Sequence, residues 1–385
     1  MRKLILLIYL MLTVLNVYAN TAIMPKGKGT KEEPFLIERW ENLYWMSVPN
    51  TINGISYQQK MEKYYVQTAD ISFPKNIGRT DKGIGWIPIG TVYSDNWRLY
   101  SFKGSYNGQN YKIDGLYSGC DYEAGLFGKV LNAELKNIHL TNVMVAGESH
   151  IGALAGSVFY DSSLTPKFKN TIENCSSTGK IVGDEIAGGL IGSVSGYKLI
   201  NCYSKCDIDI KGYYVGGLIG EAESTQLINC YTISNVSGNL YIGGIAGIFS
   251  GKMNNCFSNG KVNAKSKAGG LLGEVRNNIE IENSYSLSVV KADEKAGGLF
   301  PPHEEYYYVI LYNSYYKLSN NLIKGKIVRT EGALEDLEFE NWLRNGKKTK
   351  HLMLKKNDKG EYLISSVNDL KLINSIKQDK DNKFI

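Results

Sequence analysis

The sequence predicts an all-β protein, a single-stranded, right-handed parallel β-helix whose coils stack along one axis. Three observations favour this fold class: a glycine motif that recurs along the chain, an Asn-Cys motif that alternates with it, and many short runs of strand-forming residues. One repeat cannot bury an apolar face alone, but stacked repeats pair each strand with its neighbours about 4.8 Å away. The general preference for right-handed crossovers sets the expected handedness.

The composition is typical of a globular, β-rich chain. The 385 residues include 41 Gly and only 8 Pro, and 43% are hydrophobic, which argues against collagen and against disorder. Residues 344–385 hold eleven Lys or Arg and five Asp or Glu, so this tail alone carries the formal net charge of +6. The rest of the chain is near neutral, which argues against nucleic acid as a partner.

The N-terminus has the three-part pattern of a secretory signal peptide over residues 1–19. Arg2 and Lys3 precede an apolar run at residues 4–15, and we expect cleavage after Ala19. The run is shorter than the roughly 20 residues that a membrane-spanning helix needs. The protein is therefore expected to be secreted or displayed at the cell surface, with no transmembrane helix after signal cleavage.

Residues 20–118 are expected to form the N-terminal cap and the first coils. After an extended opening segment, the apolar spacing within residues 40–48 (WENLYWMSV) predicts a short amphipathic helix. This capping helix would cover the open end of the β-helix core.

The glycine motif occurs seven times within residues 119–320, the expected repeat region. Successive copies are 28, 36, 28, 27, 26 and 28 residues apart, and the long spacing contains an insertion. The second glycine of each central pair suits a close approach between backbones, and the next Leu or Ile should fill the interior. These structural positions are Gly189, Leu190, Gly217, Leu218, Gly244, Ile245, Gly270 and Leu271.

The Asn-Cys motif defines two further columns of the repeat. Asparagine suits a bend and can stack into a ladder of side-chain amides. The next position needs a small residue, because serine replaces cysteine in the last copies; we favour buried thiols over disulfides or a metal site. The residues concerned are Asn201, Asn229, Asn255, Asn283, Cys175, Cys202, Cys230 and Cys256.

The alternation of AGGLIG and INCYS resembles the GLUG-motif repeat of bacterial secreted and surface proteins. Residues 29–37 (GTKEEPFLI), 86–90 (WIPIG) and 102–115 (FKGSYNGQNYKIDG) also resemble the opening coils of such β-helices. The resemblance covers residues 28–316 and implies the β-helix fold. The repeat is also found beside the catalytic part of IgA-cleaving metallopeptidases, but it is itself an auxiliary module, so no activity follows from it.

The sequence offers little chemistry for catalysis. His303 is not followed by a second histidine four residues later, as a zinc-protease helix requires. Asp207 and Asp209 would share one face of a strand; a solvated face is favoured over a glycosidase pair. We therefore expect no enzyme activity, no metal and no cofactor.

The aromatic residues two positions after the marker asparagine should stack into one column. A structural column is favoured, and a carbohydrate-facing strip is the alternative. Further tyrosines precede the glycine motifs. The candidate binding residues are Tyr203, Tyr231, Phe257, Tyr285, Tyr213 and Tyr214.

Residues 321–385 are expected to form a small α/β appendage, which either caps the solenoid or begins an incomplete second module. Residues 361–374 repeat the apolar pattern of residues 34–47, and the charged residues 345–360 would tether them. The whole sequence favours an exported or surface-displayed, non-enzymatic, adhesin-like interaction module. A host or cell-surface protein and a glycan are both conceivable ligands. The alternatives are a polysaccharide-active enzyme and an accessory fragment of a larger surface peptidase or adhesin.

Overall fold

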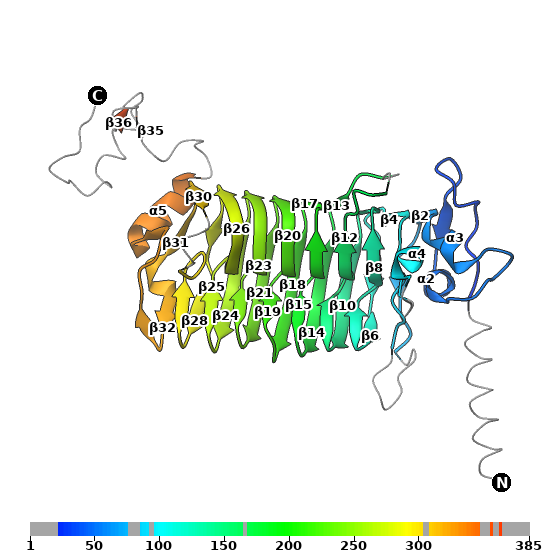
Figure 1. Cartoon of the computed structure of the whole chain (residues 1–385), viewed down its shortest axis with the longest axis horizontal. Helices are drawn as coiled ribbons and strands as arrows, with labels where there is room; N and C mark the ends of the chain where they lie inside the picture. Colours follow the sequence, from blue (N-terminus) through cyan, green and yellow to red (C-terminus); the bar gives the residue numbers. More distant parts are fainter. Residues whose placement is uncertain are drawn as a thin grey trace, which may run out of the picture.

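The computed structural model describes residues 22–75, 85–91, 96–164, 168–302 and 308–346, with two short strands, β35 (Lys355–Lys356) and β36 (Tyr362–Leu363). They form an all-β parallel solenoid of about ten turns, which confirms the predicted fold class. The turns follow one another along a single axis, with helices at both ends (Figure 1). The expected signal peptide at 1–19 lies outside the described residues.

Three sheets form the solenoid wall in the described part of the chain. One sheet has thirteen strands: β1 (Phe35–Ile37), β2 (Tyr64–Gln67), β4 (Ser105–Asn107), β8 (Phe127–Leu131), β9 (Glu134–Lys136), β12 (Ala155–Phe159), β13 (Thr171–Glu173), β16 (Ile191–Ser195), β17 (Lys198–Ile200), β20 (Ile219–Ile228), β23 (Ala246–Asn254), β26 (Leu272–Glu282) and β30 (Val309–Tyr312). A second has fourteen: β3 (Ile71–Ser72), β5 (Lys112–Asp114), β6 (Tyr117–Gly119), β10 (His139–Gly147), β14 (Ser176–Gly183), β18 (Tyr203–Ile210), β21 (Tyr231–Gly238), β24 (Phe257–Ala264), β27 (Tyr285–Ser286), β28 (Val289–Ala292), β31 (Tyr315–Lys317), β32 (Asn321–Ile323), β33 (Lys326–Ile327) and β34 (Ala333–Leu334).

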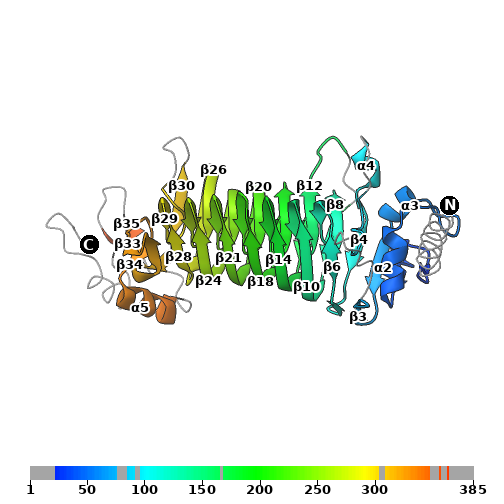
Figure 2. The ribbon, with the colours of Figure 1, turned by 90° about the horizontal axis from the view of Figure 1, so that it is seen from below.

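The third sheet has seven short strands: β7 (Tyr122–Ala124), β11 (Ser149–Gly152), β15 (Ile186–Gly188), β19 (Tyr214–Gly216), β22 (Tyr241–Gly243), β25 (Lys267–Gly269) and β29 (Lys295–Gly297). Each repeat passes through the seven-stranded, the thirteen-stranded and the fourteen-stranded sheet in turn. Strands β10, β14, β18, β21, β24 and β28 follow one another along the axis in Figure 2. Corresponding positions of successive repeats therefore form straight rows.

The glycine motif makes the corner between the seven-stranded and the thirteen-stranded sheet. A Cβ atom added at Gly217 would collide with the carbonyl oxygen of Gly244 in the next turn, so this position has no room for a side chain. The apolar residues after the glycines are fully buried, and the backbone N–H of Leu218 donates to the carbonyl of Ile245 at 2.9 Å. Leu190, Leu218, Ile245 and Leu271 thus form one row inside the core.

The marker asparagines make the corner before the fourteen-stranded sheet. Asn201, Asn229, Asn255 and Asn283 all have φ between 49° and 55°, a left-handed conformation that asparagine tolerates better than most residues. The side-chain amide of Asn229 donates to Oδ1 of Asn201 at 3.0 Å, and that of Asn255 donates to Oδ1 of Asn229 at 2.7 Å. The predicted amide ladder is present from Asn201 to Asn255, and Asn283 instead accepts from the side-chain amide of Asn313 at 2.8 Å.

The cysteines that follow the asparagines point into the core. Cys175, Cys202, Cys230 and Cys256 are free and fully buried. The Cys256 thiol accepts a hydrogen bond from the backbone N–H of Cys230 at 3.4 Å and donates to the carbonyl of Asn254 at 3.3 Å. Ser284 takes over both roles one turn later, which explains why serine replaces cysteine in this row.

Short helices cover the N-terminal end of the core: α2 (Trp40–Ser47), α3 (Tyr57–Met61) and, beside the next coil, α4 (Trp97–Tyr100). Helix α2 occupies the segment predicted to cap the solenoid, and Leu43, Trp45 and Met46 on it are fully buried. No helix in the described ranges is long and apolar enough to cross a membrane.

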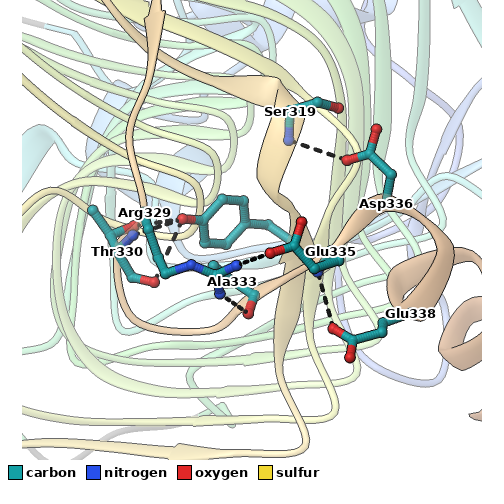
Figure 3. A network of polar contacts seen from close by, with 8 residues as sticks. Ser319, Arg329, Thr330, Ala333, Glu335, Asp336 and Glu338 are labelled. Carbon is teal, nitrogen blue, oxygen red and sulfur yellow. Dashed lines mark hydrogen bonds and ion pairs between the residues drawn. The ribbon is translucent and has the colours of Figure 1, made fainter. Parts of the chain in front are cut away.

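The C-terminal end is closed by the 3-10 helix η1 (Leu318–Asn320), by β34 and by helix α5 (Asp336–Gly346). Figure 3 shows the polar contacts that fix this region: Arg329 pairs with Glu335 and donates to the carbonyl of Ala333, and the backbone N–H of Ser319 donates to Asp336 at 3.2 Å. Phe339 on α5 is buried against the last coil.

The solenoid continues beyond residue 320, where the sequence suggested a boundary. Strand β32 pairs with β28, and β34 pairs with β31, so both belong to the fourteen-stranded sheet. Residues 321–346 are therefore the terminal coil and its cap. Strands β35 and β36 form a separate antiparallel pair, while most of the tether at 345–360 and of the segment at 361–374 lies outside the described residues.

Candidate functional site

The first candidate surface is the aromatic row, which we define as Tyr203, Tyr231, Phe257 and Tyr285. Each ring opens a strand of the fourteen-stranded sheet. The preceding residue, a cysteine in three copies and Ser284 in the last, is buried, so the ring projects outward because side chains alternate along a strand. Neighbouring ring centroids are 4.8, 4.9 and 5.2 Å apart, and the rings are parallel within 9°. The rings therefore cover one another's faces. Tyr285 is buried at 6% exposure, whereas Tyr203, Tyr231 and Phe257 are half-buried and reach solvent mainly with their edges.

This packing limits what the aromatic row can bind. A sugar ring stacks on the exposed face of an aromatic ring, whereas here most faces are already in contact with the next ring. At the outer end of the row, Lys205 Nζ lies 5.4 Å from the centroid of the Tyr203 ring. At the other end, Trp342 on α5 packs T-shaped against Tyr285 at 5.7 Å and against Tyr315, in register one turn later, at 5.1 Å. The geometry supports the structural interpretation of this row better than the carbohydrate strip.

The second candidate surface is the tyrosine–arginine patch, which consists of Tyr213, Tyr214, Tyr241 and Arg276. The inward-facing neighbours of Tyr214 and Tyr241 are fully buried, so both tyrosines project outward from the seven-stranded sheet. Next to them, β23 passes close to β19. This close approach requires glycine at position 247, because an added Cβ atom there would collide with the β19 backbone. The tyrosines consequently lie beside the outward face of the thirteen-stranded sheet.

Charged groups hold the rings of Tyr214 and Tyr241 in place, and the Tyr213 ring lies 6.4 Å from that of Tyr214. The Arg276 guanidinium lies 5.4 Å from the centroid of the Tyr214 ring, donates to its hydroxyl at 3.3 Å and pairs with Glu221 at 3.2 Å. Lys267 Nζ lies 4.9 Å from the centroid of the Tyr241 ring and pairs with Glu274 at 2.9 Å. The Tyr214 and Tyr241 rings are 5.6 Å apart. The patch is thus ordered before any ligand arrives.

The patch remains accessible in spite of these contacts. Tyr213 is 53% exposed, and the Arg276 side chain is 46% exposed. Tyrosine and arginine are among the residues enriched at the centre of protein–protein interfaces. The arrangement can therefore offer stacking, hydrogen bonding and a positive charge to a partner surface.

The six candidate binding residues from the sequence do not form one site. Tyr203 opens β18, whereas Tyr213 and Tyr214 follow its far end. The strand from Tyr203 to Ile210 spans about 23 Å at roughly 3.3 Å per residue. The aromatic row and the patch therefore lie along opposite margins of the fourteen-stranded sheet.

The acidic pair considered for glycoside hydrolysis lies on an exposed face. Asp207 and Asp209 alternate with the buried Ile208 and Ile210 on β18. Asn235 donates to the Asp207 carboxylate at 3.0 Å, and the Ser237 hydroxyl donates to that of Asp209 at 2.8 Å. The two carboxylates thus take part in side-chain contacts with the next turn, as the solvated-face interpretation expected.

The described histidines are held by neighbouring polar groups. His139 contacts the Ser176 hydroxyl at 2.8 Å and Asn110 at 3.2 Å, and His150 contacts the Ser149 hydroxyl at 3.1 Å. Burial lowers the pKa of both imidazoles. Within the described ranges, no group of three or more His, Cys, Asp or Glu side chains could hold a metal ion. His303 lies outside those ranges.

Sequence reasoning missed Arg276 and Trp342 as parts of these surfaces. Arg276 contacts Tyr214, which lies 62 positions earlier, so no local motif joins them. The separation of 62 positions corresponds to about two repeats. An alignment of the repeats would therefore have placed Arg276 and Tyr214 on neighbouring rows of the solenoid. Trp342 has no counterpart in any repeat, so the periodic pattern could not assign it a position.

Comparison with models of known protein families gave no match. The chain is 31% identical over 172 residues to halomucin of Haloquadratum walsbyi, which is 43% of this chain and 2% of that protein. It is 33% identical over 146 residues to a "putative Gly-rich membrane protein" of Evansella cellulosilytica, which is 36% of this chain and 15% of that one. The chain thus corresponds to a small part of either relative.

Among solved structures, the chain is similar to a "putative immunoglobulin A1 protease" from Bacteroides ovatus, with a TM-score of 0.53. The similarity covers 87% of this chain and 93% of the other, at 21% sequence identity. At this level of identity, the likeness shows a shared solenoid fold and carries no activity across.

Proposed function

We propose that this protein is an exported or surface-displayed, non-enzymatic interaction module that binds a cell-surface protein through the tyrosine–arginine patch. The observation that carries the proposal is the ordered and exposed arrangement of Tyr213, Tyr214, Tyr241 and Arg276 on a rigid solenoid. A surface that is already ordered loses little conformational entropy on binding, so more of the contact energy becomes affinity.

A protein ligand fits this surface better than a glycan or small molecule. Sites for small ligands are usually concave and apolar, with a few polar groups that converge on the ligand. The patch instead lies on the outside of stacked strands and combines aromatic rings with a guanidinium group, as protein interfaces do. The ring faces of the aromatic row, which would suit sugars, are largely covered by one another.

The location outside the cytoplasm is part of the proposal. It is supported by the signal-like leader in the sequence and by the relative whose name describes a membrane protein. The GLUG-type interpretation of the repeats agrees with it, since such repeats occur in secreted and surface proteins. Five buried free thiols also fit, because the core protects them from oxidation.

The test measures binding of the labelled full chain to intact bacterial and epithelial cells. We expect saturable binding that is lost after protease treatment of the cells and kept after periodate oxidation of their glycans. Tyr213→Ala combined with Arg276→Ser should weaken binding at least tenfold. Tyr122→Ala, a matched control at a tyrosine that is 48% exposed, should leave it unchanged.

Three outcomes would contradict the proposal. Binding that resists protease but is lost after periodate would identify a glycan ligand. Equal binding of the double variant and the control would move the site elsewhere. Release of reducing ends from a polysaccharide panel would show an enzyme, the alternative that the sequence left open.

A further inference from the structure

Strand β30 leaves an open edge at the C-terminal end of the thirteen-stranded sheet. In the part of the chain that the structure describes, β26 is the one strand that pairs with it. The carbonyls of Tyr308 and Tyr312 accept hydrogen bonds from Ile279 and Asn283 on the β26 side, each at 3.0 Å. Since backbone groups alternate in direction along a strand, Val309 and Leu311 direct their N–H and C=O groups to the open edge.

The side chains at this edge are unusually apolar and exposed. Tyr308 is 73%, Ile310 is 59% and Tyr312 is 41% exposed. Val309 and Leu311 point the other way and are half-buried against the end of the core. Proteins usually protect such edges with lysine, proline or a bulge, and none of these occurs between residues 308 and 312.

The opposite end of the sheet is protected. The backbone N–H of Leu36 on the first strand, β1, donates to the carbonyl of Lys26 at 2.8 Å, so an upstream segment covers that strand. Helix α2 follows β1 directly and covers the core there. The exposed edge is therefore a specific property of the C-terminal end.

The sequence of β30 with its preceding residue is Tyr-Val-Ile-Leu-Tyr, which is nearly the same in both directions. When two copies run antiparallel about Ile310, each tyrosine faces a tyrosine and each Val309 faces a Leu311. The outward-directed N–H and C=O groups of Val309 and Leu311 then form the hydrogen-bonded pairs, and the two Ile310 residues form the central pair without hydrogen bonds.

We propose that β30 pairs with β30 of a second copy, so that the protein forms a tail-to-tail homodimer. The pairing extends the thirteen-stranded sheet through both molecules and uses the same surface on each, as a two-fold symmetric interface requires. Each molecule uses its single β30 edge in the contact, so this pairing by itself closes at the dimer. The contact is smaller than the roughly 1,200–2,000 Å² of a standard interface, and the expected Kd is micromolar.

The test uses analytical ultracentrifugation of the full chain over a micromolar concentration series. We expect a monomer–dimer equilibrium for the wild type. Ile310→Lys brings two like charges together at the two-fold axis and should raise the dimer Kd at least tenfold. Ile327→Lys is the matched control, because Ile327 on β33 at the same end of the molecule is also 59% exposed; it should keep the wild-type Kd.

A cross-link provides a second measurement that does not depend on the lysine variant folding. Ile310→Cys should form a disulfide-linked dimer under mild oxidation, because opposed residues without hydrogen bonds lie within disulfide range. Ile327→Cys should stay monomeric. A wild type that is monomeric throughout the series, equal Kd values for Ile310→Lys and Ile327→Lys, or no cross-link at position 310 would each overturn the proposal.

Discussion

Trp342 on helix α5 donates a hydrogen bond from Nε1 to Oδ1 of Asn313 at 3.1 Å. Asn313 in turn donates to Oδ1 of Asn283 at 2.8 Å, so the indole extends this last asparagine pair. The same indole packs T-shaped against the rings of Tyr285 and Tyr315, at 5.7 and 5.1 Å, at the C-terminal end of the aromatic row. One side chain thus contacts both the asparagine and the aromatic positions of the last turns.

We expect Trp342→Ala to lower the free energy of unfolding by about 2–3 kcal/mol, because it removes a large, half-buried ring and leaves the Asn313 carbonyl without its donor. Urea denaturation measures the change. Leu337→Ala, on the same helix at a side chain that is 69% exposed, should change stability by less than about 0.5 kcal/mol. If both variants unfold like the wild type, α5 does not stabilise the solenoid.

Each asparagine of the ladder stabilises the fold in two ways, through its left-handed backbone conformation and through its amide hydrogen bonds. Two substitutions at position 229 separate these contributions to the free energy of unfolding. Asn229 has a φ of 55° and exchanges amide hydrogen bonds with both neighbouring turns. Asn229→Ala loses these bonds and is unfavourable at positive φ, so we expect a loss of about 2–3 kcal/mol. Asn229→Gly loses the same bonds but tolerates the backbone, and its loss should be about 1 kcal/mol smaller. Equal losses would mean that backbone conformation does not select asparagine here.

The repeat rows were predictable from sequence because every turn solves the same packing problem. The glycine before Leu218 meets the next backbone, and the thiol of Cys256 bridges two turns, so the same residue types recur at these positions. The ends of the solenoid face different surroundings. Trp342 and the open edge at Ile310 occur once each, so no periodicity points to them.

The sequence predicted which residue types form the candidate surfaces, but it did not predict which of these residues lie together. Tyr203 and Tyr214 are close in sequence, but the extended strand β18 between them separates the two rings. Arg276 is distant in sequence and yet contacts Tyr214, because stacking two further turns returns the chain to the same margin of the solenoid. Such contacts depend on the exact length of each turn.

The buried thiols lead to a prediction about chemical reactivity. Five cysteines are buried and Cys120 is half-buried, and burial raises the pKa of the Cys206 and Cys120 thiols, which disfavours the reactive thiolate. Titration of the native protein with a thiol reagent should therefore modify at most one cysteine within minutes. All six should react after denaturation without reductant. Rapid reaction of several cysteines in the native protein, or fewer than six on denaturation, would contradict the row of free, buried thiols.

Lys60 on α3 is fully buried in the N-terminal cap. Its ammonium group donates to the carbonyls of Trp45 and Val48 at 2.8 and 2.6 Å, where helix α2 ends, and it lies 5.0 Å from the centroid of the Trp45 ring. Desolvation lowers the pKa of Lys60 from its ordinary value of 10.5 to about 8. Burial of the charged amine therefore costs stability at neutral pH.

This cost should make the N-terminal cap more stable in mild alkali. Between pH 8 and 10.5 the unfolded chain binds more protons at Lys60 than the folded chain, so the free energy of unfolding rises with pH in this window. From pH 7.5 to 9.5 we expect the wild type to gain about 2 kcal/mol relative to Lys60→Met, which has no titrating group there. Tyrosine ionisation affects both proteins alike, and the difference between their urea denaturation curves isolates Lys60. Parallel pH profiles for the two proteins would show instead that the two carbonyls and the indole ring keep Lys60 charged with an ordinary pKa.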